Sequence, residues 1–240
     1  MSKYRLGIAE LDKVLGEIEG GSNIMLIGPP MCRKDALVYN ILYAGLLSGE
    51  SGILVTTEEM GGSVLKQFKQ DELDTSMERL GIVDCVSISL GIRVSDTENI
   101  KMVPNPMDLT GIGVKISQFF EQFHVRNRIQ RTRLIVNSLS TMLMYSNLQT
   151  VFRFLHVFTG RIKAADALGI YVLEAGMHDD SVIATLKQLF DGVIEIGEEG
   201  DQFFIRAKMG ARPTEWIGYD IDRTKNVTQL KGGVSRVINR

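Results

Sequence analysis

Short apolar runs alternate with stretches of helical periodicity along most of the 240-residue chain. Short apolar runs bounded by turn residues are typical of strands buried on both faces, and the stretches between them are typical of crossover helices. The pattern therefore predicts an α/β fold with a mainly parallel central sheet flanked by helices. The predicted strands cover residues 23–28, 52–57, 82–88, 133–138, 170–175, 191–197, 202–208 and 216–221.

The helical segments carry their own boundary signals. Apolar residues recur at helical spacing from Ala36 to Leu46, and the pattern stops at Gly49, which suits a position just beyond a helix end. A long amphipathic helix follows Asn147, and we interpret its aromatic face as core packing rather than as a ligand site. The last three predicted strands have no helix between them, so we expect the sheet to end in an antiparallel extension.

Composition excludes several classes of protein. A hydrophobic content of 44% suits a packed core, and a net charge of -2 gives no general attraction to nucleic acid or acidic lipid. Neither a secretion signal nor a membrane-spanning run is visible, so we expect a cytoplasmic protein. Cys32 and Cys85 do not stand at metal-ligand spacing, and we expect no dedicated metal site. We expect one domain over residues 1–230 and a flexible basic tail over residues 231–240.

The segment Gly28–Asp35 stands where a phosphate-binding P-loop would stand, between an apolar run and a helical pattern. That loop needs Gly, four residues, Gly, Lys, then Ser or Thr: the glycines let backbone N–H groups approach the phosphates, and the hydroxyl binds magnesium. Gly28 and Lys34 fit this pattern. Arg33 replaces the second glycine, and Asp35 replaces the hydroxyl.

Two positions in this segment admit more than one interpretation. Asp35 falls in the first turn of a predicted helix, where a carboxylate is stabilised by roughly 0.3–1 kcal/mol. It could replace a missing phosphate and pair with Lys34 or Arg33, or it could bind Mg²⁺ if a nucleotide binds. Cys32 lies beside two cations near a helix start, which favours a reactive thiol. An unreactive thiol that fills the former phosphate pocket is the alternative.

Four segments in order resemble KaiC-type members of the RecA superfamily, in particular single-domain KaiC-like proteins of the archaeal type. Residues 7–16 resemble the Gly-Ile-x-x-Leu-Asp run that precedes the P-loop strand, and the loop itself follows at the expected place. Residues 53–59 are similar to the strand and paired glutamates that activate the attacking water in KaiC-like ATPases. By this resemblance Glu58 and Glu59 are candidate catalytic residues.

The other two segments resemble the family with one substitution each. Residues 133–140 resemble the Walker B strand, with Asn137 in place of the magnesium-binding Asp. Residues 208–212 resemble the Lys-x-Arg element that reaches a neighbouring subunit's γ-phosphate in KaiC hexamers, with Gly210 in place of the Arg. Lys208 and Arg212 are therefore candidate interface residues.

The resemblance implies a RecA-like fold and a degenerate nucleotide site, with ATP and Mg²⁺ as possible ligands. The candidate nucleotide-site residues are Gly28, Pro29, Pro30, Met31, Cys32, Arg33, Lys34, Asp35 and Asn137. We interpret the chain as a pseudo-ATPase with a regulatory or assembly role. It would form homo-oligomers, or hetero-oligomers with an active RecA/KaiC-like paralogue.

Two alternatives remain open. A weak Mg-ATPase would bind nucleotide through Gly28 and Lys34, with Asp35 as metal ligand and Glu58 or Glu59 as base. A DNA-associated recombinase paralogue would contact phosphates through the basic tail and an arginine run, whose more ordinary interpretation is a solvated helix end. The run consists of Arg126, Arg128, Arg131 and Arg133.

Overall fold

The computed structural model describes residues 1–70, 74–200, 202–210 and 213–219. The strands are β1 (Lys3–Tyr4), β2 (Ile18–Glu19), β3 (Asn23–Gly28), β4 (Ser51–Thr56), β5 (Leu80–Asp84), β6 (Ile100–Met102), β7 (Thr132–Asn137), β8 (Leu168–Glu174), β9 (Gly192–Glu199), β10 (Gln202–Met209) and β11 (Ile217–Tyr219). The α-helices are α1 (Ala9–Leu15), α2 (Lys34–Leu47), α3 (Gly61–Gln70), α4 (Leu109–Phe120), α5 (Leu139–Tyr145), α6 (Leu148–Ala164) and α7 (Asp180–Lys187). A 3-10 turn, η1 (Asp74–Arg79), precedes β5, and a π-helical turn, η2 (Glu121–Arg126), continues α4.

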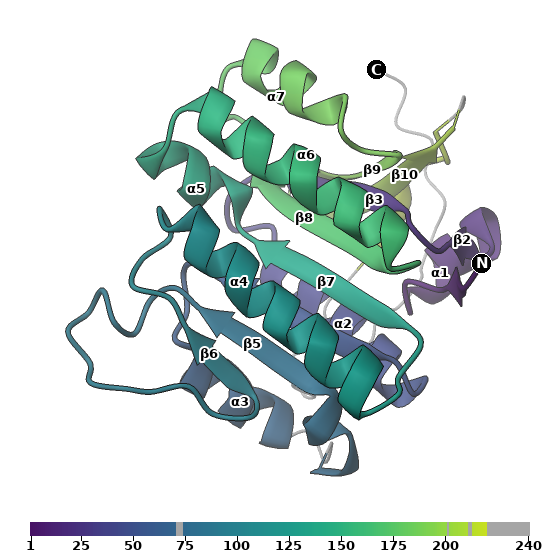
Figure 1. Cartoon of the computed structure of the whole chain (residues 1–240). Helices are drawn as coiled ribbons and strands as arrows, with labels where there is room; N and C mark the ends of the chain where they lie inside the picture. Colours follow the sequence, from purple (N-terminus) through teal and green to yellow (C-terminus); the bar gives the residue numbers. More distant parts are fainter. Residues whose placement is uncertain (71–73, 201, 211–212, 220–240) are drawn as a thin grey trace.

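Most of the described strands form one nine-stranded sheet in the order β11-β10-β9-β3-β8-β7-β4-β5-β6 (Figure 1). All neighbours from β9 to β6 in this order pair in parallel, whereas β10 and β11 are antiparallel. Parallel neighbours need crossover connections, and the helices supply them. The predicted α/β fold with its antiparallel C-terminal extension is therefore confirmed.

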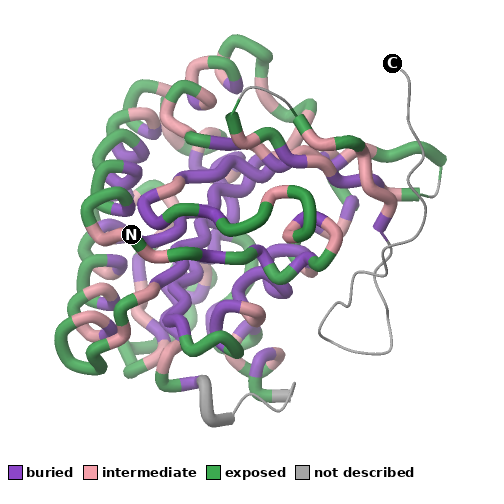
Figure 2. Tube along the Cα trace, turned by 90° about the vertical axis from the view of Figure 1, so that its right-hand side faces the viewer, coloured by how far each residue is buried: buried purple, intermediate pink, exposed green. Residues whose placement is uncertain are grey.

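Alternating strand residues enter two cores, one on each face of the sheet. In β3, Ile24 and Leu26 belong to the core that also contains residues of α1, α2 and α3, whereas Met25 belongs to the core that contains residues of α4, α5, α6 and α7. Figure 2 shows the buried segments running through the middle of the molecule, with exposed positions along the outer helices. The chain thus has the three-layer arrangement of a doubly covered parallel sheet.

Two sequence expectations about the elements have clear outcomes. The helix predicted after Asn147 is α6, and its apolar face is buried, as expected. The stretch from residue 89 to 110, in which no strand is predicted, contains the edge strand β6. This strand has only three residues, too few for an alternating pattern to stand out.

The expectation that the arginine run is a solvated surface is wrong at its C-terminal end. Arg133 is 1% exposed and forms a buried ion pair with Glu50, and it also donates hydrogen bonds to the Ile41 and Arg5 carbonyls at 2.8 and 2.6 Å. Gly45 makes room for it, because a Cβ there would lie 2.5 Å from the Arg133 Nε.

Arg131 is also engaged at this end of the run. Its guanidinium lies 3.4 Å from the Glu50 carboxylate and donates to the Ser48 carbonyl at 2.9 Å. Arg126 and Arg128 alone among the four are exposed. The run is therefore not a continuous basic surface.

Within the described ranges, no helix is both long and apolar enough to cross a membrane. Arg212 and the tail predicted over residues 231–240 lie outside the described residues.

Candidate functional site

The segment Gly28–Asp35 joins the end of β3 to the first turn of α2. This junction lies at the carboxyl edge of the parallel sheet, where β4, β7 and β8 also end. Ligands of open α/β sheets bind outside this edge. The structure brings Glu58, Glu59 and Asn137 to the same edge, as the sequence predicted, and adds Glu174 at the end of β8.

The loop backbone takes conformations that glycine adopts more readily than other residues. Met31 has φ 60°, and Arg33 has φ 58° and ψ 36°, both in the left-handed region. A residue with a Cβ in this region costs roughly 1–2 kcal/mol. Arg33 therefore stands where the chain would favour the glycine of an intact P-loop.

The Lys34 ammonium is held inside the loop. Lys34 is 5% exposed, and its Nζ donates to the Pro29 carbonyl at 2.8 Å and to Glu174 Oε2 at 2.7 Å. The Cys32 Sγ lies 3.7 Å away in a third contact. All three ammonium donors therefore have a protein acceptor.

Glu174 is the site residue that sequence reasoning missed. It lies 140 positions from Lys34 in the chain, so no local pattern joins the two. The available signal was positional: Glu174 ends the strand that pairs with β3, and the register sets it opposite Gly28. Lys34 was expected to pair with Asp35 or solvent, and the structure gives it this other partner.

Cys32 packs under the loop as an interior residue. Its side chain is fully buried, and a Cβ on Gly28 would lie 2.9 Å from the Cys32 Sγ, so this close approach requires glycine. Burial raises the pKa of the Cys32 thiol, and the nearby Lys34 only partly opposes this. Of the two sequence interpretations, the geometry favours the unreactive thiol that fills the pocket.

Asp35 and Asn137 are partners across the site. The Asn137 Nδ2 donates to Asp35 Oδ1 at 2.8 Å, joining the end of β7 to the first turn of α2. An amide can make this contact, whereas an aspartate at position 137 would set a second negative charge against Asp35. Asn137 thus serves as a hydrogen-bond donor to a neighbouring carboxylate.

The paired glutamates point to different partners. Glu58 Oε1 accepts hydrogen bonds from Ser138 Oγ at 3.0 Å and Thr141 Oγ1 at 3.1 Å, which hold it to the start of α5. Partial burial and the charge of Asp35 raise the pKa of Glu59, and a hydrogen bond from Tyr39 only partly opposes this.

Among the described residues, no group of His, Cys, Asp and Glu is arranged to hold a metal ion.

Lys208 lies apart from this cluster. It is exposed on β10 opposite Val193, which is level with Met25 near the beginning of β3. The loop lies at the other end of the same strand. Within one chain, the structure therefore does not bring Lys208 to the candidate nucleotide site.

Residues 21–196 match the model of a family of unknown function, DUF7504. The match covers well over half of the chain and includes the loop, both glutamates and Asn137. This chain is a member of DUF7504. A search of curated proteins gives no match to the DUF7504 chain.

Two solved structures with the fold of this DUF7504 chain come from the archaeon Pyrococcus horikoshii. One is the uncharacterized protein PH0321 in complex with an unknown peptide, with TM-score 0.72, 15% identity, and coverage of 96% of this chain and 100% of that one. Another is the KaiC-like protein PH0186, with TM-score 0.67, 13% identity, and coverage of 97% and 99%. The resemblance to KaiC-type proteins is thereby confirmed at the level of the fold.

Proposed function

We propose that this protein is a RecA/KaiC-like pseudo-ATPase that acts as a regulatory or assembly protein. The observation that carries the proposal is the Lys34 ammonium, which contacts Pro29 and Glu174 inside the loop. In a working P-loop this ammonium reaches the outer phosphates. Here a protein carboxylate already neutralises it, so a nucleotide would have to displace that carboxylate.

The charges around the loop support the same conclusion. Asp35 sets a fixed negative charge in the first turn of α2, where the positive end of the helix would otherwise attract phosphate. The charge of Asp35 acts on Glu59, and Glu174 lies beside Gly28 and pairs with Lys34. A triphosphate would therefore meet several carboxylates, while the buried cation of the loop, Lys34, is already paired with Glu174.

A weak Mg-ATPase is the second candidate, and the retained Gly28 and Lys34 favour it. It would require Lys34 to leave Glu174 and Asp35 to exchange its amide partner for Mg²⁺. The third candidate, a DNA-associated paralogue, loses support because Arg131 and Arg133 are engaged with Glu50. The sequence departures at Arg33, Asp35 and Asn137 affect the backbone cradle and both magnesium positions, which favours loss of hydrolysis.

We expect Mg-ATP to bind with a Kd above about 1 mM and not to be hydrolysed. The loop ammonium is paired with Glu174, and the two magnesium positions, Asp35 and Asn137, are hydrogen-bonded to each other. Isothermal titration calorimetry and a phosphate-release assay on the purified chain measure this. Glu59→Gln serves as the matched variant, since it removes the candidate base without touching the loop. Submicromolar affinity with turnover that Glu59→Gln abolishes would overturn the pseudo-ATPase proposal.

We also expect the chain to assemble, either with itself or with an active RecA/KaiC-like paralogue, through the face that carries Lys208. By the sequence resemblance, Arg212 is a second candidate contact residue. Lys208 is exposed and remote from its own loop, which suits contact with a neighbouring subunit's site. A contact between one face of a subunit and a different face of the next, repeated from subunit to subunit, forms a closed ring or an open filament. Light scattering over a concentration series, alone and with candidate paralogues from the same cell, measures the assembly.

The double variant Lys208→Glu with Arg212→Glu is expected to dissociate the assembly, whereas Lys66→Glu, at an exposed lysine of α3 near β5, is the control. A strict monomer that forms no complex and is unchanged by the double variant contradicts the assembly proposal.

A further inference from the structure

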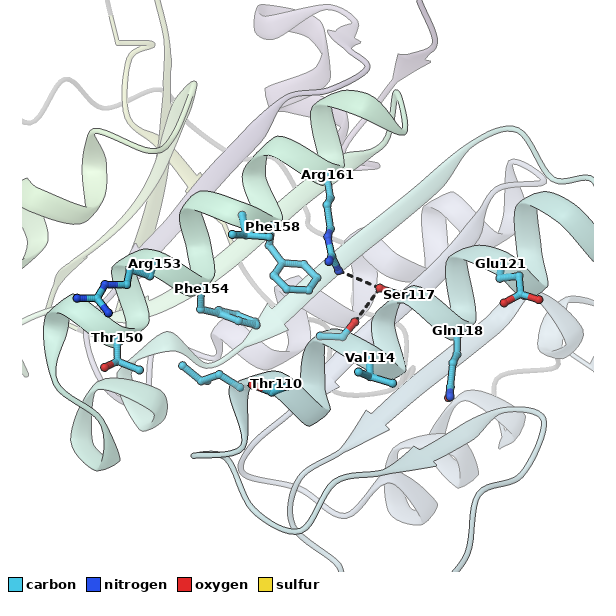
Figure 3. Close-up of a pocket in the computed structure, with 13 residues that line it drawn as sticks. Thr110, Val114, Ser117, Gln118, Glu121, Thr150, Arg153, Phe154, Phe158 and Arg161 are labelled. Atoms are coloured by element: carbon cyan, nitrogen blue, oxygen red, sulfur yellow. Dashed lines mark hydrogen bonds between the residues drawn. The ribbon is translucent and has the colours of Figure 1, made fainter.

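A groove of about 560 Å³ runs between α4 and α6, and no residue of the candidate nucleotide site lines it (Figure 3). Phe154 and Phe158 of α6 form its floor and point toward α4, and both are buried. Val114 of α4 and Val157 of α6 stand along it, and they are 51% and 49% exposed. The groove therefore offers an apolar floor between two half-exposed valines, open to an apolar side chain from outside.

The groove results from small side chains on α4. A Cβ on Gly113 would come 3.0 Å from the Phe158 ring, so the two helices touch at this point. On either side, Thr110 and Ser117 face α6 and are too short to fill the space beside the phenylalanines. The small side chains of α4 therefore leave the groove open.

The rim of the groove on α6 is positive. The Arg161 guanidinium lies 4.9 Å from the Phe158 ring centre and donates to Ser117 Oγ at 2.9 Å, which holds it at one end. Arg153 is exposed at the other end, and it makes no hydrogen bond or ion pair within the described ranges. The one acidic lining residue, Glu121, already lies 3.5 Å from Arg126. The unbalanced charge thus favours an acidic ligand.

The length of the groove selects the shape of that ligand. Its lining on α6 runs from Thr150 to Arg161, which at 1.5 Å per residue is roughly 17 Å, or three helical turns. A helix of three turns presents apolar residues at i, i+3 and i+7 along one side, which matches a continuous apolar floor.

We propose that the α4/α6 groove binds an amphipathic α-helix of a partner protein, with apolar residues on Phe154 and Phe158 and carboxylates beside Arg153 and Arg161. This site is separate from the loop, because no residue of the loop lines it. The chain's own residues 220–240 do not suit the groove, because they carry five basic and two acidic side chains. A second copy placed by a two-fold axis would set the arginines of the rim against each other.

The test uses the full chain and three fluorescein-labelled synthetic peptides of sixteen residues. The first has Leu at i, i+3, i+7 and Glu at the flanking positions, the second has Lys in place of Glu, and the third is the first in scrambled order. Fluorescence anisotropy is expected to show binding of the Glu peptide, about tenfold weaker binding of the Lys peptide, and none of the scrambled one.

Two pairs of variants locate the binding. Val157→Asn is expected to weaken binding of the Glu peptide about tenfold. Val125→Asn, at an exposed valine outside the groove, is expected to leave the affinity unchanged. Arg153→Glu is expected to reverse the preference toward the Lys peptide, whereas Arg128→Glu is not. Circular dichroism melts check that each variant folds. If Val157→Asn fails to fold, the comparison of Arg153→Glu with Arg128→Glu still tests the proposal.

Several outcomes overturn the proposal. One is absence of binding by the Glu peptide, and another is equal binding of the scrambled peptide. Tighter binding of a peptide of residues 220–240 would assign the groove to the chain's own tail. Self-association that Val157→Asn abolishes would assign it to a second copy.

Discussion

A variant that carries Arg33→Gly, Asp35→Thr and Asn137→Asp together is expected to gain measurable Mg-ATP binding, at least about a hundredfold above the parent chain, or roughly 2.8 kcal/mol. Glycine adopts the left-handed backbone of position 33 without cost and lets phosphates approach. Threonine and aspartate restore the two magnesium contacts, and they remove the bond between Asp35 and Asn137. Calorimetry with Mg-ATP is the measurement.

The structure sharpens this experiment through Glu174. Adding Glu174→Gln to the triple variant is expected to raise affinity further, because Lys34 then loses its charged partner. Each single reversion is expected to gain much less than the triple variant, and Glu174→Gln alone is the control for the freed lysine. If the folded triple variant binds no nucleotide, with or without Glu174→Gln, the assignment of 28–35 to a P-loop position loses its support.

Glu50→Ala is expected to lower the free energy of unfolding by about 3–5 kcal/mol. Both Glu50 and Arg133 have side chains that are 1% exposed, so the substitution leaves a buried guanidinium without its carboxylate. Arg131 loses the same partner. Urea denaturation followed by circular dichroism measures the loss.

Two controls separate the buried charge from a general effect of substitution. The double variant Glu50→Leu with Arg133→Met removes both charges and is expected to recover most of the loss. Glu10→Ala breaks an exposed pair with Lys13 and is expected to cost less than about 1 kcal/mol. If Glu50→Ala unfolds at the same midpoint urea concentration as the parent chain, the buried pair contributes nothing to the free energy of unfolding.

The order of the strands of the main sheet, apart from β6, could be predicted because each of them carries its own local pattern. The two-residue strands β1 and β2 are too short to show one. The run from Asn23 to Ile27, the helical spacing after Ala36 and the apolar face of α6 are all visible within a few turns of chain. The three-residue strand β6 escaped because its pairing with β5, rather than its sequence, makes it a strand.

The candidate site was predictable in position but not in its contacts. Parallel strands that end at one sheet edge bring Lys34, Asp35, Glu59 and Asn137 together, and the ends of these strands can be located from the sequence pattern. The partner of Lys34 depends on the register of β3 against β8, and no local pattern encodes it. The burial of Arg133 likewise depends on distant groups on α2 and at Glu50.

The hydroxyl of Tyr219 donates to the Cys32 carbonyl at 3.0 Å, so the edge strand β11 is fastened to the loop after β3. Tyr219 is buried, and any rearrangement that turns the Cys32 carbonyl away must leave that hydroxyl without its acceptor. Opening of the loop and release of the sheet edge are therefore reciprocal. Whatever free energy this hydrogen bond contributes to coupling the two changes, the coupling is the same in either direction.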